Sequence, residues 1–99
     1  MEITLQYFDG CPNWKTADAR LTELISGRRD LTLRRELVAT AEQAERIGFR
    51  GSPSILVDGV DPFADPNAPV GLACRIYATP AGPAGAPTTA QLREVLGDA

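Results

Sequence analysis

The chain has two cysteines and no histidine, and these counts bound the chemistry available to its side chains. Cys–His nucleophile pairs, histidine general bases and imidazole metal sites are excluded, and two thiols are too few for a structural zinc site. The remaining chemistry belongs to Cys11 and Cys74, which could exchange disulfides or bind soft metal ions. We expect no cofactor and no resident metal.

Cys11 lies in residues 9–14, Asp-Gly-Cys-Pro-Asn-Trp, where an apolar run stops at a glycine and a helical pattern follows. Pro12 suits the first helical position because its missing N–H would be unpaired there, so Cys11 is the predicted N-cap. The helix dipole and free N–H groups would stabilise a thiolate at that position. We therefore predict a reactive, partly exposed thiol; the alternative is an N-cap that has lost any redox role.

Length and composition predict one domain over residues 1–99, with 43% hydrophobic residues. The net charge of −3 argues against nucleic-acid and anionic-membrane partners, since both attract basic surfaces. No apolar run approaches the ~20 residues of a spanning helix. The strand pattern begins too close to Met1 for a signal peptide. These features predict a cytoplasmic protein, whose cysteines are expected to be free thiols.

The apolar spacing predicts an α/β fold with the element order β-α-β-α-β-β-α around a central mixed four-stranded sheet. Strands are expected over residues 3–8, 31–37, 54–57 and 72–77. Helices are expected from Trp14 to a stop at Gly27, from Thr40 through Ile47, and from Thr88 through Leu96. The first two strands should be parallel. Prolines and glycines predict loops over residues 61–69 and 79–87.

Two segments resemble the thioredoxin-like superfamily. Residues 7–14, Tyr-Phe-Asp-Gly-Cys-Pro-Asn-Trp, resemble the strand-to-helix turn that holds the family's Cys-x-x-Cys motif. Residues 44–57 resemble the segment in which a short helix, an Arg-Gly pair and a cis-proline lead into the central strand. The chain is also similar to short bacterial members with an Asp-Gly-Cys-Pro-Asn turn and a Gly-Leu-x-Cys-Arg segment. Some of these carry alkylmercury-lyase labels.

The resemblance implies that Pro53 is cis and lies opposite Cys11, on a strand antiparallel to the first. It also implies a groove beside Cys11, in which an extended substrate peptide could pair with the backbone near Ser52. Arg50 is expected across this groove, where its charge would favour the thiolate and Asp9 would oppose it.

The sequence departs from the family motif at Trp14, which occupies the position of the second cysteine. Indole cannot attack a mixed disulfide, so the usual resolution step would be lost. We predict that Trp14 belongs to the core or lines the groove; the alternative is that it shapes a pocket for a thiol ligand.

Cys74 could replace the missing resolving thiol. Counting back along its predicted strand places it roughly 10 Å from the strand end that should border Pro53, at about 3.4 Å per residue. A disulfide needs α-carbons within about 7 Å. Because Cys74 also shares a strand face with Leu72 and Ile76, we predict a buried structural cysteine.

The leading hypothesis is a thiol-dependent redox protein in which Cys11 alone forms mixed disulfides with a thiol-containing protein or a low-molecular-weight thiol. Its activity would be that of a monothiol thiol–disulfide oxidoreductase. One alternative is a thioredoxin-fold binding module without redox turnover, which burial of Cys11 beneath Phe8 and Trp14 would favour. Another is a soft-metal or organomercurial binding protein that needs both thiols. The sequence leaves the oligomeric state open.

Overall fold

The structure is a computed structural model, and it describes residues 1–97. Its elements, in chain order, are β1 (Glu2–Tyr7), α1 (Trp14–Ile25), β2 (Thr32–Leu37), α2 (Ala41–Ile47), β3 (Ser54–Val57), β4 (Tyr77–Thr79), β5 (Gly82–Ala84) and α3 (Thr89–Leu96). The described chain forms a mixed α/β fold with three helices, a three-stranded mixed sheet and a separate two-stranded sheet.

The three-stranded sheet has the order β2-β1-β3. β1 pairs in parallel with β2 and antiparallel with β3, as predicted, and Leu5 at its centre lies between Arg35 and Ile55. Leu5 and Ile55 are fully buried, whereas Arg35 on the outer strand is exposed. β1 is therefore the central strand, and the chain leaves its carboxyl end directly into the turn that carries Cys11.

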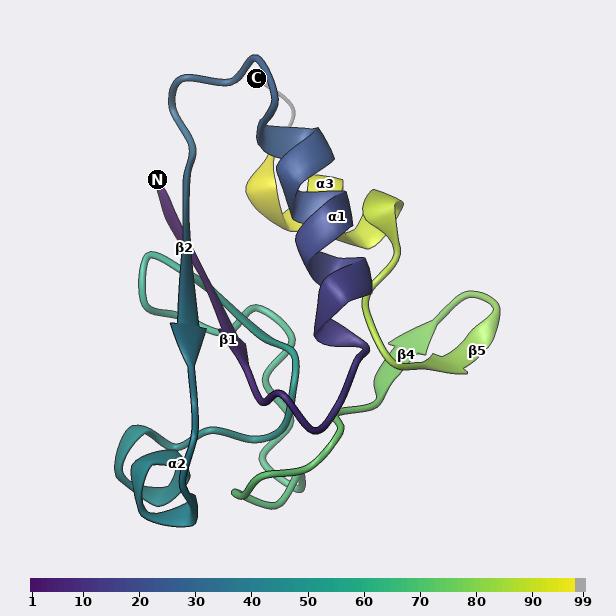
Figure 1. The fold of residues 1–99 in the computed structure, drawn as a ribbon. Helices are drawn as coiled ribbons and strands as arrows, with labels where there is room; N and C mark the ends of the chain where they lie inside the picture. Colours follow the sequence, from purple (N-terminus) through teal and green to yellow (C-terminus); the bar gives the residue numbers. More distant parts are fainter. Residues whose placement is uncertain (98–99) are drawn as a thin grey trace.

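The prediction of a four-stranded sheet was wrong. Residues 72–76 form no strand, and β4 begins only at Tyr77. It pairs with β5, inside the segment predicted to be a loop. Gly82, at φ 111°, and a hydrogen bond from Thr79 Oγ1 to the Gly82 carbonyl at 2.5 Å close this hairpin locally. The hairpin projects from the body instead of extending the sheet (Figure 1).

α1 and α3 lie next to each other on one face of the three-stranded sheet (Figure 1). Their apolar side chains join those of β1 and β3 in the main core, which comprises Ile3, Leu5, Ala17, Leu21, Leu31, Ile55, Ala86, Leu92 and Leu96. A second cluster, of Val38, Ala44 and Phe49, fixes α2 at the far end of the molecule, with Phe8 and Leu72 packed against it. The second cluster borders the turn that carries Cys11, because Phe8, which leads into that turn, packs against the cluster.

The predicted helix ends are confirmed for α2 and α3. Thr40 and Thr88 accept hydrogen bonds from the N–H groups of Gln43 and Gln91, and Gly48 adopts a left-handed C-cap. For α1 the prediction was wrong by two residues, because the N-cap is Asn13 and not Cys11. Among residues 1–97 we find no helix with the length and apolar character needed to cross a membrane.

Candidate thiol–disulfide site

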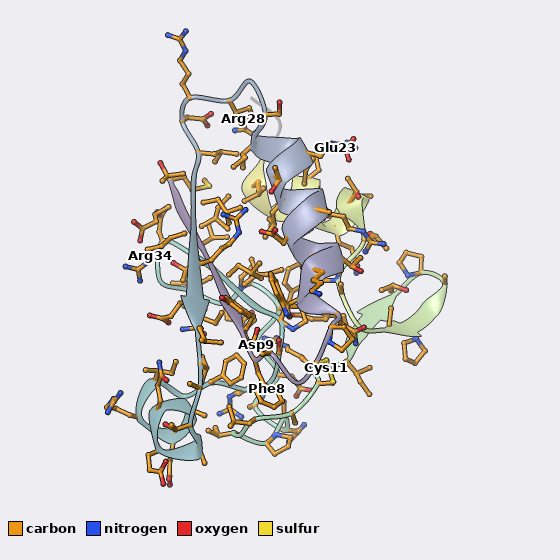
Figure 2. All side chains as sticks on the ribbon, in the orientation of Figure 1. Phe8, Asp9, Cys11, Glu23, Arg28 and Arg34 are labelled. Carbon is orange, nitrogen blue, oxygen red and sulfur yellow. A yellow bond between two sulfur atoms is a disulfide. The ribbon has the colours of Figure 1, made fainter. Side chains whose placement is uncertain are left out.

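Cys11 and Cys74 form a disulfide, with their α-carbons 5.6 Å apart. In Figure 2 the bonded sulfurs lie beside the turn that leads into α1. Three predictions are therefore wrong: that the cysteines are free thiols, that Cys74 is buried, and that it lies too far from Cys11 to pair with it. The predicted distance between Cys74 and Cys11 depends on a regular strand over residues 72–77. Residues 72–76 form no strand, and the course of their backbone places Cys74 next to Cys11.

The segment around Cys74 is held by the backbone of Ser52. The Ser52 N–H donates to the Ala73 carbonyl at 2.8 Å, and the Arg75 N–H donates to the Ser52 carbonyl at 3.0 Å. Ser52 and Cys74 thus form an isolated parallel bridge. The chain's own residues 73–75 occupy the position at which the resemblance implied that a substrate peptide would pair.

Gly51 makes this close pairing possible. Its φ of 110° is a conformation that side chains rarely adopt, and an added Cβ would lie 3.0 Å from Cβ of Arg75 and 3.2 Å from the Ala73 carbonyl oxygen. Any larger residue would push the Cys74 segment away from Ser52. Gly51 is therefore needed for the contact between the two backbones, which explains its place directly before Ser52.

The peptide bond between Ser52 and Pro53 is cis, as predicted. The Ser52 hydroxyl accepts a hydrogen bond from the Phe8 N–H at 3.0 Å, which connects this segment to the turn before Cys11. The Pro53 carbonyl accepts from the Tyr77 hydroxyl. Burial raises the pKa of Tyr77, so its phenol stays protonated and remains a donor. The turn that precedes Cys11 and the strand that follows Cys74 are thus both hydrogen-bonded to the cis-proline segment.

The two cysteines differ sharply in exposure. Cys11 is 0% exposed, which contradicts the prediction of a partly exposed thiol, whereas Cys74 is an exposed residue. Cys11 still lies at the positive end of α1: the N–H groups of Lys15 and Thr16 donate to the carbonyls of Pro12 and Asn13. Within residues 1–97 the N–H groups of Asn13 and Trp14 have no acceptor. Cys11 thus lies near the positive end of the helix dipole, two residues before the N-cap Asn13.

Trp14 belongs to the core region, as predicted. Its ring contacts that of Tyr7 in a tilted arrangement with the centroids 4.3 Å apart, and its side chain packs against the main core. The Phe8 ring lies over Gly10, because a Cβ added at Gly10 would come 2.4 Å from the ring. These aromatic groups fix the backbone on both sides of Cys11 and so fix the direction of α1.

Arg50 does not take the predicted role beside Cys11. Its Nη1 donates to the carbonyls of Pro66 and Ala68, so it supports the proline-rich loop of residues 61–69. Arg50 and Cys74 both line a half-open cavity of about 460 Å³ between this loop and residues 73–78. Arg50 is thus brought to the exposed side of the disulfide and not to its buried side.

Sequence reasoning missed Arg75, the residue after Cys74. Its side chain is buried, forms a salt bridge with Asp61 at 2.6 Å, and donates to the Phe63 carbonyl at 2.5 Å and to Ser54 Oγ at 3.3 Å. The guanidinium also lies 4.7 Å from the centroid of the Tyr77 ring. The available signal is an arginine within an apolar stretch, with an aspartate in the nearby loop of residues 61–69.

Comparisons of this chain with protein-family models, curated proteins and solved structures gave no match. The thioredoxin-like resemblance, including its link to proteins with alkylmercury-lyase labels, therefore stays a prediction. The function must be inferred from the site itself.

Proposed function

We propose that the protein is a thioredoxin-like thiol–disulfide exchange protein whose redox couple is the Cys11–Cys74 disulfide. The observation that carries this proposal is the disulfide between a buried cysteine just before α1 and a cysteine at an exposed position on a neighbouring segment. Cys74 supplies the second thiol that a dithiol mechanism needs and that Trp14 cannot supply. The single-thiol mechanism is thereby replaced by a dithiol mechanism.

The proposed reaction, the reduction of the protein disulfide by two partner thiols, conserves atoms and electrons. A partner thiolate attacks one sulfur of the disulfide, its own sulfur forms the new S–S bond, and the displaced cysteine leaves as a thiolate with the bonding electron pair. A second partner thiolate then attacks the partner's sulfur in the mixed disulfide. The protein ends as a dithiol and the two partner thiols end as one disulfide, so two electrons pass to the protein.

The geometry near the site supports the thioredoxin-like assignment. β1 runs into the cysteine turn and α1, β3 lies antiparallel to β1, and the cis Ser52–Pro53 bond precedes β3 next to the disulfide. The partners we propose remain a thiol-containing protein or a low-molecular-weight thiol, in the cytoplasm.

A redox titration tests the proposal. We expect excess dithiol to open the disulfide while circular dichroism still reports a folded chain, and added oxidised dithiol to close it again. Alkylation followed by mass spectrometry would count two thiols in the reduced form and none in the oxidised form. Reduction that occurs only together with unfolding would contradict the proposal.

The burial of Cys11 favours a second candidate, a binding module in which the disulfide only stabilises the fold. That candidate predicts that the disulfide resists reduction for as long as the chain is folded. The soft-metal alternative requires both sulfurs at one site, and their bond places them there. It predicts that the dithiol form binds one Hg²⁺ tightly and that loss of either cysteine abolishes this binding.

A further inference from the structure

We propose that exchange takes place at Cys74, with Cys11 as the leaving thiolate, and that the partner is a low-molecular-weight thiol carrying a carboxylate. This inference rests on the proposed function and deepens it by assigning the attacked atom and the class of substrate. It depends on the difference in exposure between the cysteines and on the cavity that Cys74 and Arg50 share.

Exposure selects the sulfur that is attacked. Thiol–disulfide exchange requires the incoming thiolate to reach one sulfur, and Cys11 is 0% exposed while Cys74 is exposed. Attack at Cys74 makes Cys11 the leaving group, and a thiolate there would lie close to the N-terminal end of α1. Access therefore selects attack at Cys74.

The cavity beside Cys74 selects a small partner. Its volume of about 460 Å³ lies in the range of small-molecule sites. The nearest buried backbone groups, the N–H and carbonyl of Ser52, are already bonded to residues 73 and 75. An extended peptide would have to displace these bonds before it could pair there, whereas a small thiol reaches Cys74 with them intact.

The charges that line the cavity favour an anion. Two cations, Arg50 and Arg75, and one anion, Asp65, line it. Arg75 is paired with Asp61, and the Asp65 carboxylate accepts from the Asn67 N–H at 2.9 Å within its own loop. Arg50 uses Nη1 for its two carbonyl bonds, and within residues 1–97 its Nε and Nη2 have no acceptor. Arg50 therefore keeps donors available for a carboxylate that binds in the cavity it lines.

The reaction follows from this placement. The small thiolate forms a bond to Sγ of Cys74, the Sγ–Sγ bond breaks, and Cys11 retains the electron pair as a thiolate. A second molecule of the same thiol then attacks the first molecule's sulfur, which leaves Cys74 as a thiolate and releases a symmetrical small disulfide. Two thiols are oxidised and one protein disulfide is reduced.

Two variants test the carboxylate preference through rates of disulfide reduction by 3-mercaptopropionate and by neutral 2-mercaptoethanol, each expressed per thiolate. We expect Arg50→Gln to lower the ratio of the 3-mercaptopropionate rate to the 2-mercaptoethanol rate by about threefold or more. Added salt should weaken the preference of the wild-type protein for 3-mercaptopropionate, because it screens the charge of Arg50. The control is Arg46→Gln, a change at an exposed position of α2, which should leave the ratio unchanged. An unchanged ratio in Arg50→Gln overturns the assignment of a carboxylate partner.

Two further variants test the site of attack. With the disulfide of 3-mercaptopropionate, Cys74 in Cys11→Ser should form a mixed disulfide at least about tenfold faster than Cys11 in Cys74→Ser, because reactivity follows exposure. Equal rates, or a faster Cys11, overturn the assignment. Should either variant fail to fold, the wild-type protein is exposed briefly to 3-mercaptopropionate and quenched in acid. Peptide mapping by mass spectrometry then shows which cysteine carries the mixed disulfide. An adduct on Cys74 supports the proposal and an adduct on Cys11 contradicts it.

These outcomes separate the inference from the proposed function. Exchange of the folded wild-type protein with an adduct on Cys11 would overturn the inference alone. An absence of any exchange in the folded wild-type protein would overturn both.

Discussion

Opening the Cys11–Cys74 disulfide is expected to lower the free energy of unfolding by about 4 kcal/mol. The bond joins residues 63 positions apart and so restricts a large part of the unfolded chain. For a domain of 99 residues this is a large share of a total stability of roughly 5–15 kcal/mol. The melting temperature should fall by about 15–30 °C.

Urea unfolding with and without reductant measures this effect. The Cys11→Ser/Cys74→Ser double variant is the matched control, because it should match the reduced wild-type protein and show no response to reductant. A change below about 1 kcal/mol on reduction would mean that the unfolded chain is not restricted as the loop length requires.

The second large effect is expected at Arg75. Arg75→Met should lower the free energy of unfolding by about 3 kcal/mol or more, because it leaves the Asp61 carboxylate without its buried partner. The side chains of the two residues are 4% and 18% exposed, so water screens the pair poorly. The Phe63 carbonyl and Ser54 Oγ would also lose a donor.

Arg34→Met provides the matched control. Arg34 lies 3.8 Å from Glu36 with 60% of its side chain exposed, and Figure 2 shows it on the outer side of β2. Loss of such a surface pair should cost less than about 1 kcal/mol. Chemical denaturation of both variants under oxidising conditions measures the difference. Equal costs would contradict a special role for the buried network, and recovery in Arg75→Met/Asp61→Leu would support it.

The central part of the fold could be predicted because local signals and burial agree there. β1, β2 and β3 have continuous or alternating apolar residues, and the helix caps at Thr40 and Thr88 depend on side chains only three residues apart. The cis bond before Pro53 was predicted from the resemblance of a whole segment. None of these features depends on how residues 58–80 cross the molecule.

The pairing of the cysteines could not be predicted, because it depends on that crossing. Residues 72–76 alternate like a strand, yet they bond to Ser52 on one side only, and the sheet gains no fourth strand. The contact requires Gly51 to leave room and Arg75 to hold the loop of residues 61–69. Such long-range contacts leave no periodic pattern in the sequence.

The stabilising effect of the disulfide does not by itself distinguish a redox couple from a structural cross-link. The disulfide and the folded state stabilise each other by the same free energy, and this is true of a redox couple and of a structural cross-link alike. The two roles differ in kinetics, because a redox couple must react while the chain is folded. Exposure of Cys74 provides that access, and complete burial of the bond would have removed it.

The most direct measurement is the rate at which a small thiol reduces the disulfide, followed at urea concentrations below the unfolding transition. Attack on the folded protein at Cys74 predicts a rate that is nearly independent of urea and far above the rate of global unfolding. A rate that rises with urea in parallel with unfolding would show that the bond is reached only in the unfolded chain. That result would contradict the assignment of Cys11 and Cys74 as a redox couple.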